Sequence, residues 1–272
     1  MQQQMQAMQQ LPPEAHQMAM TYQLGTPLAE YRGGFTGRSI GGIILGIIFT
    51  GLFGAIAIGI MNDSSSSSSD GGPIIIMVVL ALVGLCFLLW SIIAPIIYSS
   101  WRVYVCSDGF VFAKGSEVQP TRWEHVQAVW QSVTRHYRNG IYTGTTHKYT
   151  VERSDGYKVV FDDRFKKVSD LGDTLSNKAT AIMLPRVLAA YNAGNVVNFG
   201  PLSVQLQGVS NGRELLPWSQ ISDFSVNQGI VSVRKEGKWL NWSSVEVAKI
   251  PNFFVFMALV RAILDGARGR QY

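Results

Sequence analysis

The chain has 272 residues, a formal net charge of +5 and a mean hydropathy of +0.14, and 15% of its residues are charged. A wholly soluble globular protein is usually less apolar than this, so the composition argues against that class. The two cysteines, Cys86 and Cys106, also exclude a scaffold held together by several disulfides.

The apolar residues are concentrated in two blocks near the N-terminus. No charged residue lies between Arg38 and Asp63 or between Asp70 and Arg102. As helices, residues 39–61 would span about 34 Å and residues 73–98 slightly more, against about 30 Å for the hydrocarbon layer of a bilayer. A cleaved signal peptide is the alternative for the first block, but its Gln-rich leader is too long. The sequence therefore predicts a transmembrane hairpin over residues 37–100.

Charges beside the two blocks predict the orientation of the hairpin. Arg32 and Arg38 precede the first span, and Arg102 and Lys114 follow the second, whereas the polyserine loop 62–72 carries two acidic residues and no basic one. Because positive charge is retained on the cytoplasmic side, we expect a multi-pass protein of the cell membrane with both termini cytoplasmic.

Small residues recur along the first span at intervals that let helix backbones approach closely. They are Gly42, Gly46, Gly51, Ala55 and Gly59. This stripe would pack either against the chain's own second span, which we favour, or against a second copy of the chain in a homodimer. Neither span contains an ionisable residue, so a transporter or channel is not expected.

The remaining sequence divides into a tail and two similar units. Residues 1–36 are rich in Gln and Met and predict a mostly disordered tail. Short β-prone runs broken by Asp-Gly and Asn-Gly turns begin at Trp101, and each series ends in a run with helical periodicity. The expected divisions are a first unit at 101–184, a linking helix at 185–194, a second unit at 195–266 and a basic tail at 267–272.

A short motif recurs in both units and indicates a duplication. Trp123, Val126 and Val129 match Trp218, Ile221 and Phe224 in type and spacing. We expect both tryptophans to lie in the core of their units and the motif to lead into the third strand of each. The fold class predicted is α+β, with a two-helix hairpin followed by tandem units of bent antiparallel sheet closed by a helix.

These residues resemble the pleckstrin-homology-like class, and more narrowly an uncharacterised bacterial membrane family that joins a transmembrane hairpin to tandem domains of this class. The resemblance covers residues 101–266 and includes Val105 to Phe110, the Trp123 motif, Phe199 to Leu202, Leu216 to Ile221, and Ile250 to Asn252. It implies binding of lipid headgroups, peptides or other domains, without catalysis. The basic loop that lipid-binding members carry between their first two strands is replaced here by Ser107-Asp108-Gly109 and Gly200-Pro201, so phosphoinositide recognition is not implied.

Basic residues suggest where the chain could contact a membrane surface. The part after the spans contains 21 of the 23 Lys and Arg and 14 of the 18 Asp and Glu, which gives a net charge of about +7. The candidates for anionic headgroup contact are Arg135, Arg138, Lys148, Arg164, Lys166 and Lys167. The alternative interpretation is ordinary solvated loop charge.

Other chemistry finds little support in the sequence. His125, His136 and His147 lie eleven residues apart, which fits no compact metal site. Asp162 and Asp163 would point to opposite faces of a strand. We expect no cofactor, no metal, no enzyme activity and no nucleic-acid partner. The leading hypothesis is a membrane-anchored binding or scaffold protein, and the alternative is a structural subunit of a larger membrane complex that docks through its transmembrane helices.

Overall fold

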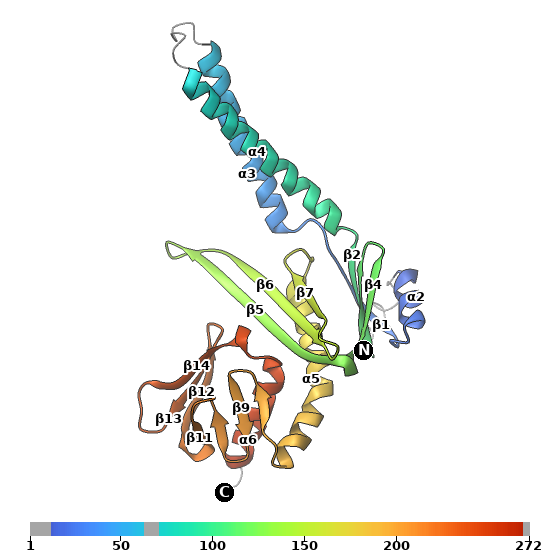
Figure 1. Cartoon of the computed structure of the whole chain (residues 1–272), viewed down its shortest axis with the longest axis vertical. Helices are drawn as coiled ribbons and strands as arrows, with labels where there is room; N and C mark the ends of the chain where they lie inside the picture. Colours follow the sequence, from blue (N-terminus) through green and yellow to red (C-terminus); the bar gives the residue numbers. More distant parts are fainter. Residues whose placement is uncertain (1–11, 63–70, 269–272) are drawn as a thin grey trace.

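The computed structural model describes residues 12–62 and 71–268. An apolar helical hairpin extends from one end of two packed β units, and the units lie side by side below it (Figure 1). The α+β class and the two long apolar helices expected from the sequence are confirmed.

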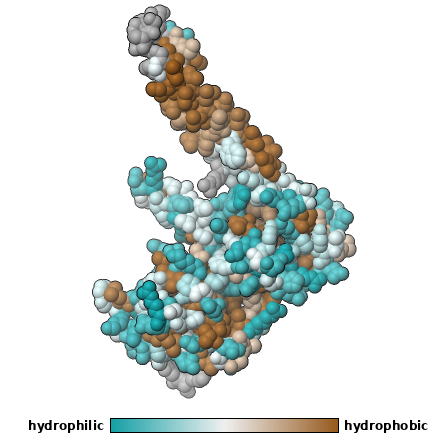
Figure 2. All heavy atoms as spheres, in the orientation of Figure 1, coloured by the Kyte–Doolittle hydropathy of each residue, from teal (hydrophilic) through white to brown (hydrophobic). Residues whose placement is uncertain are grey.

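The hairpin consists of α3 (Gly37–Asn62) and α4 (Gly71–Tyr98). Within it, residues 39–62 and 74–98 are long and apolar enough to cross a membrane. In the most apolar 18-residue stretch of each helix, only 11% is buried inside the structure. Figure 2 shows the apolar surface of the hairpin projecting beyond the mostly polar units. The exposed isoleucines and leucines on both helices are suited to an apolar surrounding such as the hydrocarbon layer of a bilayer. Most of the polyserine loop lies outside the described residues.

The first unit has a four-stranded and a three-stranded antiparallel sheet and is closed by a helix. The first sheet, in spatial order, contains β1 (Pro27–Arg32), β2 (Trp101–Cys106), β3 (Gly109–Lys114) and β4 (Glu117–Arg122). The second contains β5 (Val126–Arg138), β6 (Ile141–Arg153) and β7 (Lys158–Asp162), and α5 (Val168–Asn192) follows. Aromatic and branched side chains from both sheets and from α5 form one core, in which Phe110, Trp123, Phe161 and Leu171 are fully buried.

The second unit repeats this order of elements. Its four-stranded sheet contains β8 (Val197–Phe199), β9 (Leu202–Gln205), β10 (Gly208–Ser210) and β11 (Leu215–Pro217). Its three-stranded sheet contains β12 (Ile221–Asn227), β13 (Ile230–Lys235) and β14 (Asn241–Glu246), and α6 (Phe253–Arg268) closes the unit. The expected basic tail at 267–272 therefore begins inside α6, and residues 269–272 lie outside the described residues.

The prediction of a disordered tail is wrong for residues 12–36. Helix α2 (Pro13–Thr21) packs Ala15 and Ala19, followed by Leu24, on the outer face of the first sheet. Strand β1 then pairs with β2 across the whole hairpin, with Tyr31 opposite Val103. The first unit therefore begins before the hairpin and not at residue 101, because burial of this apolar face and a full strand ladder outweigh the polar composition of the tail.

The separate linking helix expected at 185–194 is also wrong. Helix α5 continues through Pro185 to Asn192 without a break. Its first half packs in the core of the first unit, and its second half contributes Leu184, Leu188 and Tyr191 to the core of the second. A proline normally disrupts a helix interior, and packing on two cores here keeps the axis continuous.

Hydrogen bonds also join the units at Asn252, which has a positive φ just before α6. Its backbone N–H donates to the Val129 carbonyl at 2.8 Å, and its side-chain oxygen accepts the Val129 N–H at 2.9 Å. Strand β5 of the first unit is thus tied directly to the start of the closing helix of the second.

Candidate functional site

An open groove of about 970 Å³ lies where the chain leaves the first unit to begin α3. One wall is Phe35, Thr36 and Gly37, directly before and at the start of that helix. The outer part of the β5–β6 hairpin and residues of the segment 163–169, between β7 and the first turn of α5, form the rest of the lining. The three segments are far apart in sequence, and they place the groove beside the base of the apolar hairpin.

Two lysines give the groove its fixed positive charge. Lys166 and Lys167 line it from the β7–α5 loop, and both are exposed. The Lys166 N–H donates to the Arg32 carbonyl at 2.9 Å, which anchors the loop to the end of β1. Lys167 has a φ of 55° and turns the chain into α5. The first N–H groups of a helix attract negative charge, so the start of α5 adds to the lysines.

Hydroxyl and imidazole groups complete the lining. Thr143, Thr145, Thr146 and Ser169 line the groove, and Nε2 of His136 lies 2.7 Å from the Thr146 hydroxyl. The Thr143 hydroxyl already donates its proton to the His136 carbonyl at 3.1 Å, and the Thr145 hydroxyl is paired with that of Tyr142 at 2.8 Å. The two lysines are therefore the donors best suited to phosphate oxygens, which accept several hydrogen bonds at once.

His147 and Asp163 form a hydrogen-bonded pair within the lining of the groove. Nδ1 of His147 lies 3.0 Å from Oδ1 of Asp163, and the same carboxylate accepts the His147 backbone N–H at 3.2 Å. This carboxylate therefore holds β6 to the loop after β7, as well as contributing a negative charge to the lining.

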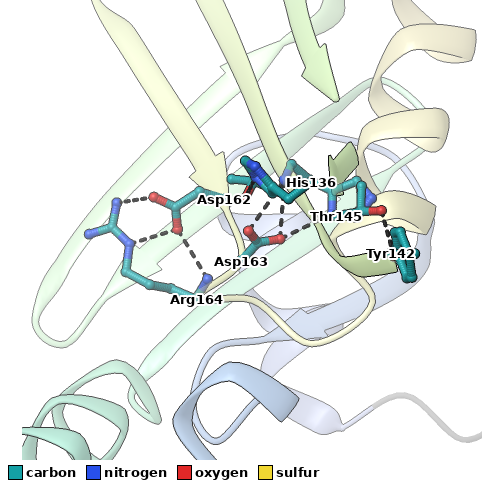
Figure 3. Close-up of polar contacts among 8 residues, drawn as sticks. His136, Tyr142, Thr145, Asp162, Asp163 and Arg164 are labelled. Atoms are coloured by element: carbon teal, nitrogen blue, oxygen red, sulfur yellow. Dashed lines mark hydrogen bonds and ion pairs between the residues drawn. The ribbon is translucent and has the colours of Figure 1, made fainter. Parts of the chain in front are cut away.

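The neighbouring carboxylate, Asp162, is turned toward Arg164 instead (Figure 3). Two hydrogen bonds of 2.7 and 2.6 Å join the Arg164 guanidinium to Asp162, and the guanidinium carbon lies 4.9 Å from the Trp101 ring centroid and 5.4 Å from that of Tyr98. Burial opposes ionisation of Asp162, but the hydrogen bonds and charge of Arg164 outweigh it and lower the pKa of this carboxyl. Arg164 thus clamps the end of α4 to the unit.

The six candidate headgroup residues are therefore divided by the fold. Lys166 and Lys167 share the groove, whereas Arg164 is engaged by Asp162 beside it. Arg135 and Arg138 lie on the outer half of β5, opposite Thr145 and Ile141 respectively. Lys148 lies further down on β6, opposite Asp162 of β7. The threonines and the Phe35 to Gly37 wall have no motif in the sequence, because only the tertiary fold brings these segments together.

The three equally spaced histidines do not converge on one point. His136 and His147 both line the groove, while His125 ends the short 3₁₀ turn Trp123–His125. Within residues 12–62 and 71–268, no group of three or more His, Cys, Asp or Glu side chains is placed to hold a metal ion.

The small-residue stripe of α3 is split between two environments. A Cβ added at Gly42 would lie 2.9 Å from Oγ of Ser91, and one at Gly46 would lie 2.9 Å from Cβ of Leu88, so this end packs against the chain's own α4. At Gly51 and Gly59 an added Cβ would meet no atom of the described structure within 4 Å. Ala55, between them, is exposed.

The duplicated tryptophan motif occupies equivalent places in both units. Trp123 opens the 3₁₀ turn before β5, and Trp218 opens the turn Trp218–Gln220 before β12, so the motif leads into the fifth strand of each unit and not the third. Indole Nε1 of Trp123 donates to the carbonyl of Cys106 at the end of β2, and that of Trp218 donates to Gln205 at the end of β9. Val126 and Val129 are buried in the first core, and Ile221 and Phe224 pack partly buried against the second unit's clusters.

The comparisons with known proteins identify a family without assigning an activity. No curated protein and no solved structure matches the chain. The sequence model of DUF6585, a family of unknown function, matches residues 1–268, which include α2, the hairpin and both units. The chain therefore belongs to the DUF6585 family of unknown function.

Proposed function

We propose that this chain is a membrane-anchored, non-catalytic binding protein that presents tandem pleckstrin-homology-like units at the cytoplasmic face of the cell membrane. Two observations support the pleckstrin-homology-like assignment. Each unit has a four-stranded sheet, a three-stranded sheet and a closing helix, and both repeat the same tryptophan contact. The multi-pass topology rests on the apolar hairpin and on the positive charge of its flanks.

We further propose that the groove beside α3 takes the phosphate of an anionic lipid headgroup. The observation that carries this proposal is the position of the groove: its wall is the residue run Phe35 to Gly37, from which the first span begins. Lipid phosphates lie at that depth if α3 crosses the bilayer. Each Lys or Arg near an anionic leaflet contributes attraction of about 1 kcal/mol.

Native mass spectrometry of the detergent-solubilised full chain tests this assignment. The protein is titrated with phosphatidylglycerol or phosphatidylcholine, and the variant Lys166→Gln/Lys167→Gln is compared with Lys235→Gln/Lys238→Gln, which removes the same charge from the second unit. We expect the first variant to lose preferential binding of phosphatidylglycerol and the second to keep it. Equal loss in both variants would show general electrostatic attraction, and no loss in either would contradict the groove as the site. Competition by inorganic phosphate would distinguish recognition of the phosphate alone from recognition of the whole lipid.

One observation favours the second candidate, a structural subunit that docks through its helices. Gly51 and Gly59 leave part of α3 open in the described structure. Close helix approach at such a surface would join this chain to another membrane helix.

A further inference from the structure

The β5–β6 hairpin of the first unit is much longer than its counterpart in the second. Strands β5 and β6 have 13 residues each, whereas β12 and β13 have seven and six. Strand β7 pairs with Lys148 to Glu152 of β6, so residues 133–147 extend beyond it. We call residues 133–147 the distal ribbon. This extension occurs in the unit that carries the apolar hairpin.

The end of the distal ribbon is apolar and aromatic. Tyr137, Ile141 and Tyr142 are 62%, 70% and 54% exposed, and the two tyrosine rings lie 5.9 Å apart across the strands. Val133 is also exposed. A two-stranded ribbon is only marginally stable in water by itself, and exposed apolar side chains at its end indicate a contact surface.

The distal ribbon also has the charge expected of a membrane contact. It contains Arg135 and Arg138 and no acidic residue. Tyrosine favours the boundary between headgroups and acyl chains, and arginine favours the level of the lipid phosphates. Two arginines beside three large exposed side chains at the turn of the ribbon match an anionic lipid surface better than an acidic protein partner. Charge alone would suit an acidic protein, but the side chains of Tyr137, Ile141 and Tyr142 also need an apolar or interfacial surrounding.

The position of the distal ribbon brings it to the bilayer. His136 and Thr143 to Thr146 form the groove together with Phe35 to Gly37, so the ribbon lies beside the start of α3. In Figure 1 the turn between β5 and β6 is level with the base of the helical hairpin and well away from the opposite end of the unit.

We propose that the distal ribbon is a second membrane contact of this protein, in which Tyr137, Ile141 and Tyr142 enter the interfacial layer of the leaflet while Arg135 and Arg138 lie among its phosphates. This inference rests on the part of the proposed function in which α3 and α4 cross the bilayer. It does not depend on headgroup binding in the groove.

Lipid-borne quenching of a fluorophore tests the proposal in the full-length protein. The variant Cys86→Ser/Ile141→Cys carries an environment-sensitive NBD label at the ribbon end, and Cys86→Ser/Ser154→Cys carries it on the β6–β7 turn at the other end of β6. Cys106 is fully buried, and burial raises the pKa of its thiol to about 11, so it should remain unlabelled. Both proteins are reconstituted in vesicles of phosphatidylcholine and phosphatidylglycerol that carry no nitroxide, a nitroxide on the upper acyl chain, or a deep nitroxide near the end of the acyl chain.

The labelled wild type, modified at Cys86 in α4, reports separately on the hairpin. We expect the upper-chain nitroxide to remove most of the emission at position 141 and to leave position 154 nearly unchanged. Cys86 lies midway along the span 74–98, so the deep nitroxide should remove most of its emission. Emission at both position 141 and Cys86 should be shifted to the blue. Quenching at Cys86 without quenching at 141 would overturn the ribbon contact while leaving the membrane hairpin intact. Absence of quenching at Cys86 as well would overturn both. A label at Tyr142→Cys repeats the measurement one residue away, and it should follow position 141.

Discussion

Leu24 offers the sharpest test that the segment before the hairpin belongs to the folded unit. It is fully buried and packs with Ala19, Tyr104 and Cys106 between α2 and the outer face of the first sheet. Its backbone N–H donates to the Ala19 carbonyl at 2.9 Å, which fixes the chain as it leaves α2. We predict that Leu24→Ala destabilises the protein, whereas Met20→Ala, at a side chain that is 73% exposed, does not.

The magnitude follows from the burial of Leu24. Truncating a buried leucine to alanine costs about 2–5 kcal/mol, depending on how far the site collapses. The cluster around Leu24 is small and lies on the outside of the sheet, so we expect the lower half of that range. For a domain of 150–250 residues each kcal/mol lowers Tm by about 2–4 °C, which gives a decrease of roughly 4–14 °C.

Thermal unfolding of the full chain in detergent, followed by circular dichroism and tryptophan fluorescence, measures this difference. Met20→Ala should stay within about 0.5 kcal/mol of wild type, as surface substitutions usually do. Equal and negligible effects of the two variants would refute the packing of residues 12–24 on the sheet and restore a disordered tail.

Two further predictions concern the hairpin and its base. Gly46→Val should disturb the packing of α3 on α4, because its Cβ would lie 2.9 Å from Cβ of Leu88. Gly51→Val is the control, since a Cβ there meets no atom of the described structure within 4 Å. Crosslinking between cysteines placed on the two helices should fall for the first variant and not for the second. The lowered pKa of Asp162 predicts a stabilisation that is present above the ordinary carboxyl pKa of about 4 and is lost as pH falls through the lower folded value. Unfolding measured from pH 7 to pH 2 should therefore show a smaller acid-dependent loss in Asp162→Asn than in wild type, and equal losses would contradict the Arg164 clamp.

The parts of the fold that the sequence could predict are those with local signals. An uninterrupted apolar run of more than 20 residues indicates a spanning helix by itself. Asp-Gly and Asn-Gly turns mark hairpins. The matching Trp123 and Trp218 motifs indicated the duplication, and each tryptophan makes the same hydrogen bond in its unit.

The features that the sequence could not predict depend on distant partners. Strand β1 is six residues long, and its partner β2 begins only after the hairpin, so no nearby turn reveals the pairing. Pro185 indicated a helix boundary by the usual rule, yet burial of both halves of α5 keeps it whole. The groove likewise combines loop, ribbon and helix start, and none of these segments carries a motif of its own.

Comparison of the two units shows where the hairpin was accommodated in the fold. In the second unit, Gly200 and Pro201 alone separate β8 from β9. The equivalent strands of the first unit, β1 and β2, are separated by residues 33–100, which contain the whole hairpin. The two ends of this insertion touch, because a Cβ on Gly33 would lie 2.2 Å from the Tyr98 carbonyl oxygen.

A hairpin joined to a sheet at two adjacent strands holds its unit differently from a single flexible linker. Both connections are short, and the Gly33 N–H donates to the Trp101 carbonyl at 2.9 Å while Arg164 packs on Tyr98 and Trp101. Rotation about the hairpin axis would break these contacts at both connections together. If α3 and α4 cross a bilayer, the same end of the first unit must always face it, and that end carries the groove and the distal ribbon. The lipid contacts proposed for them would then need no recruitment step, since the chain itself keeps them at the surface.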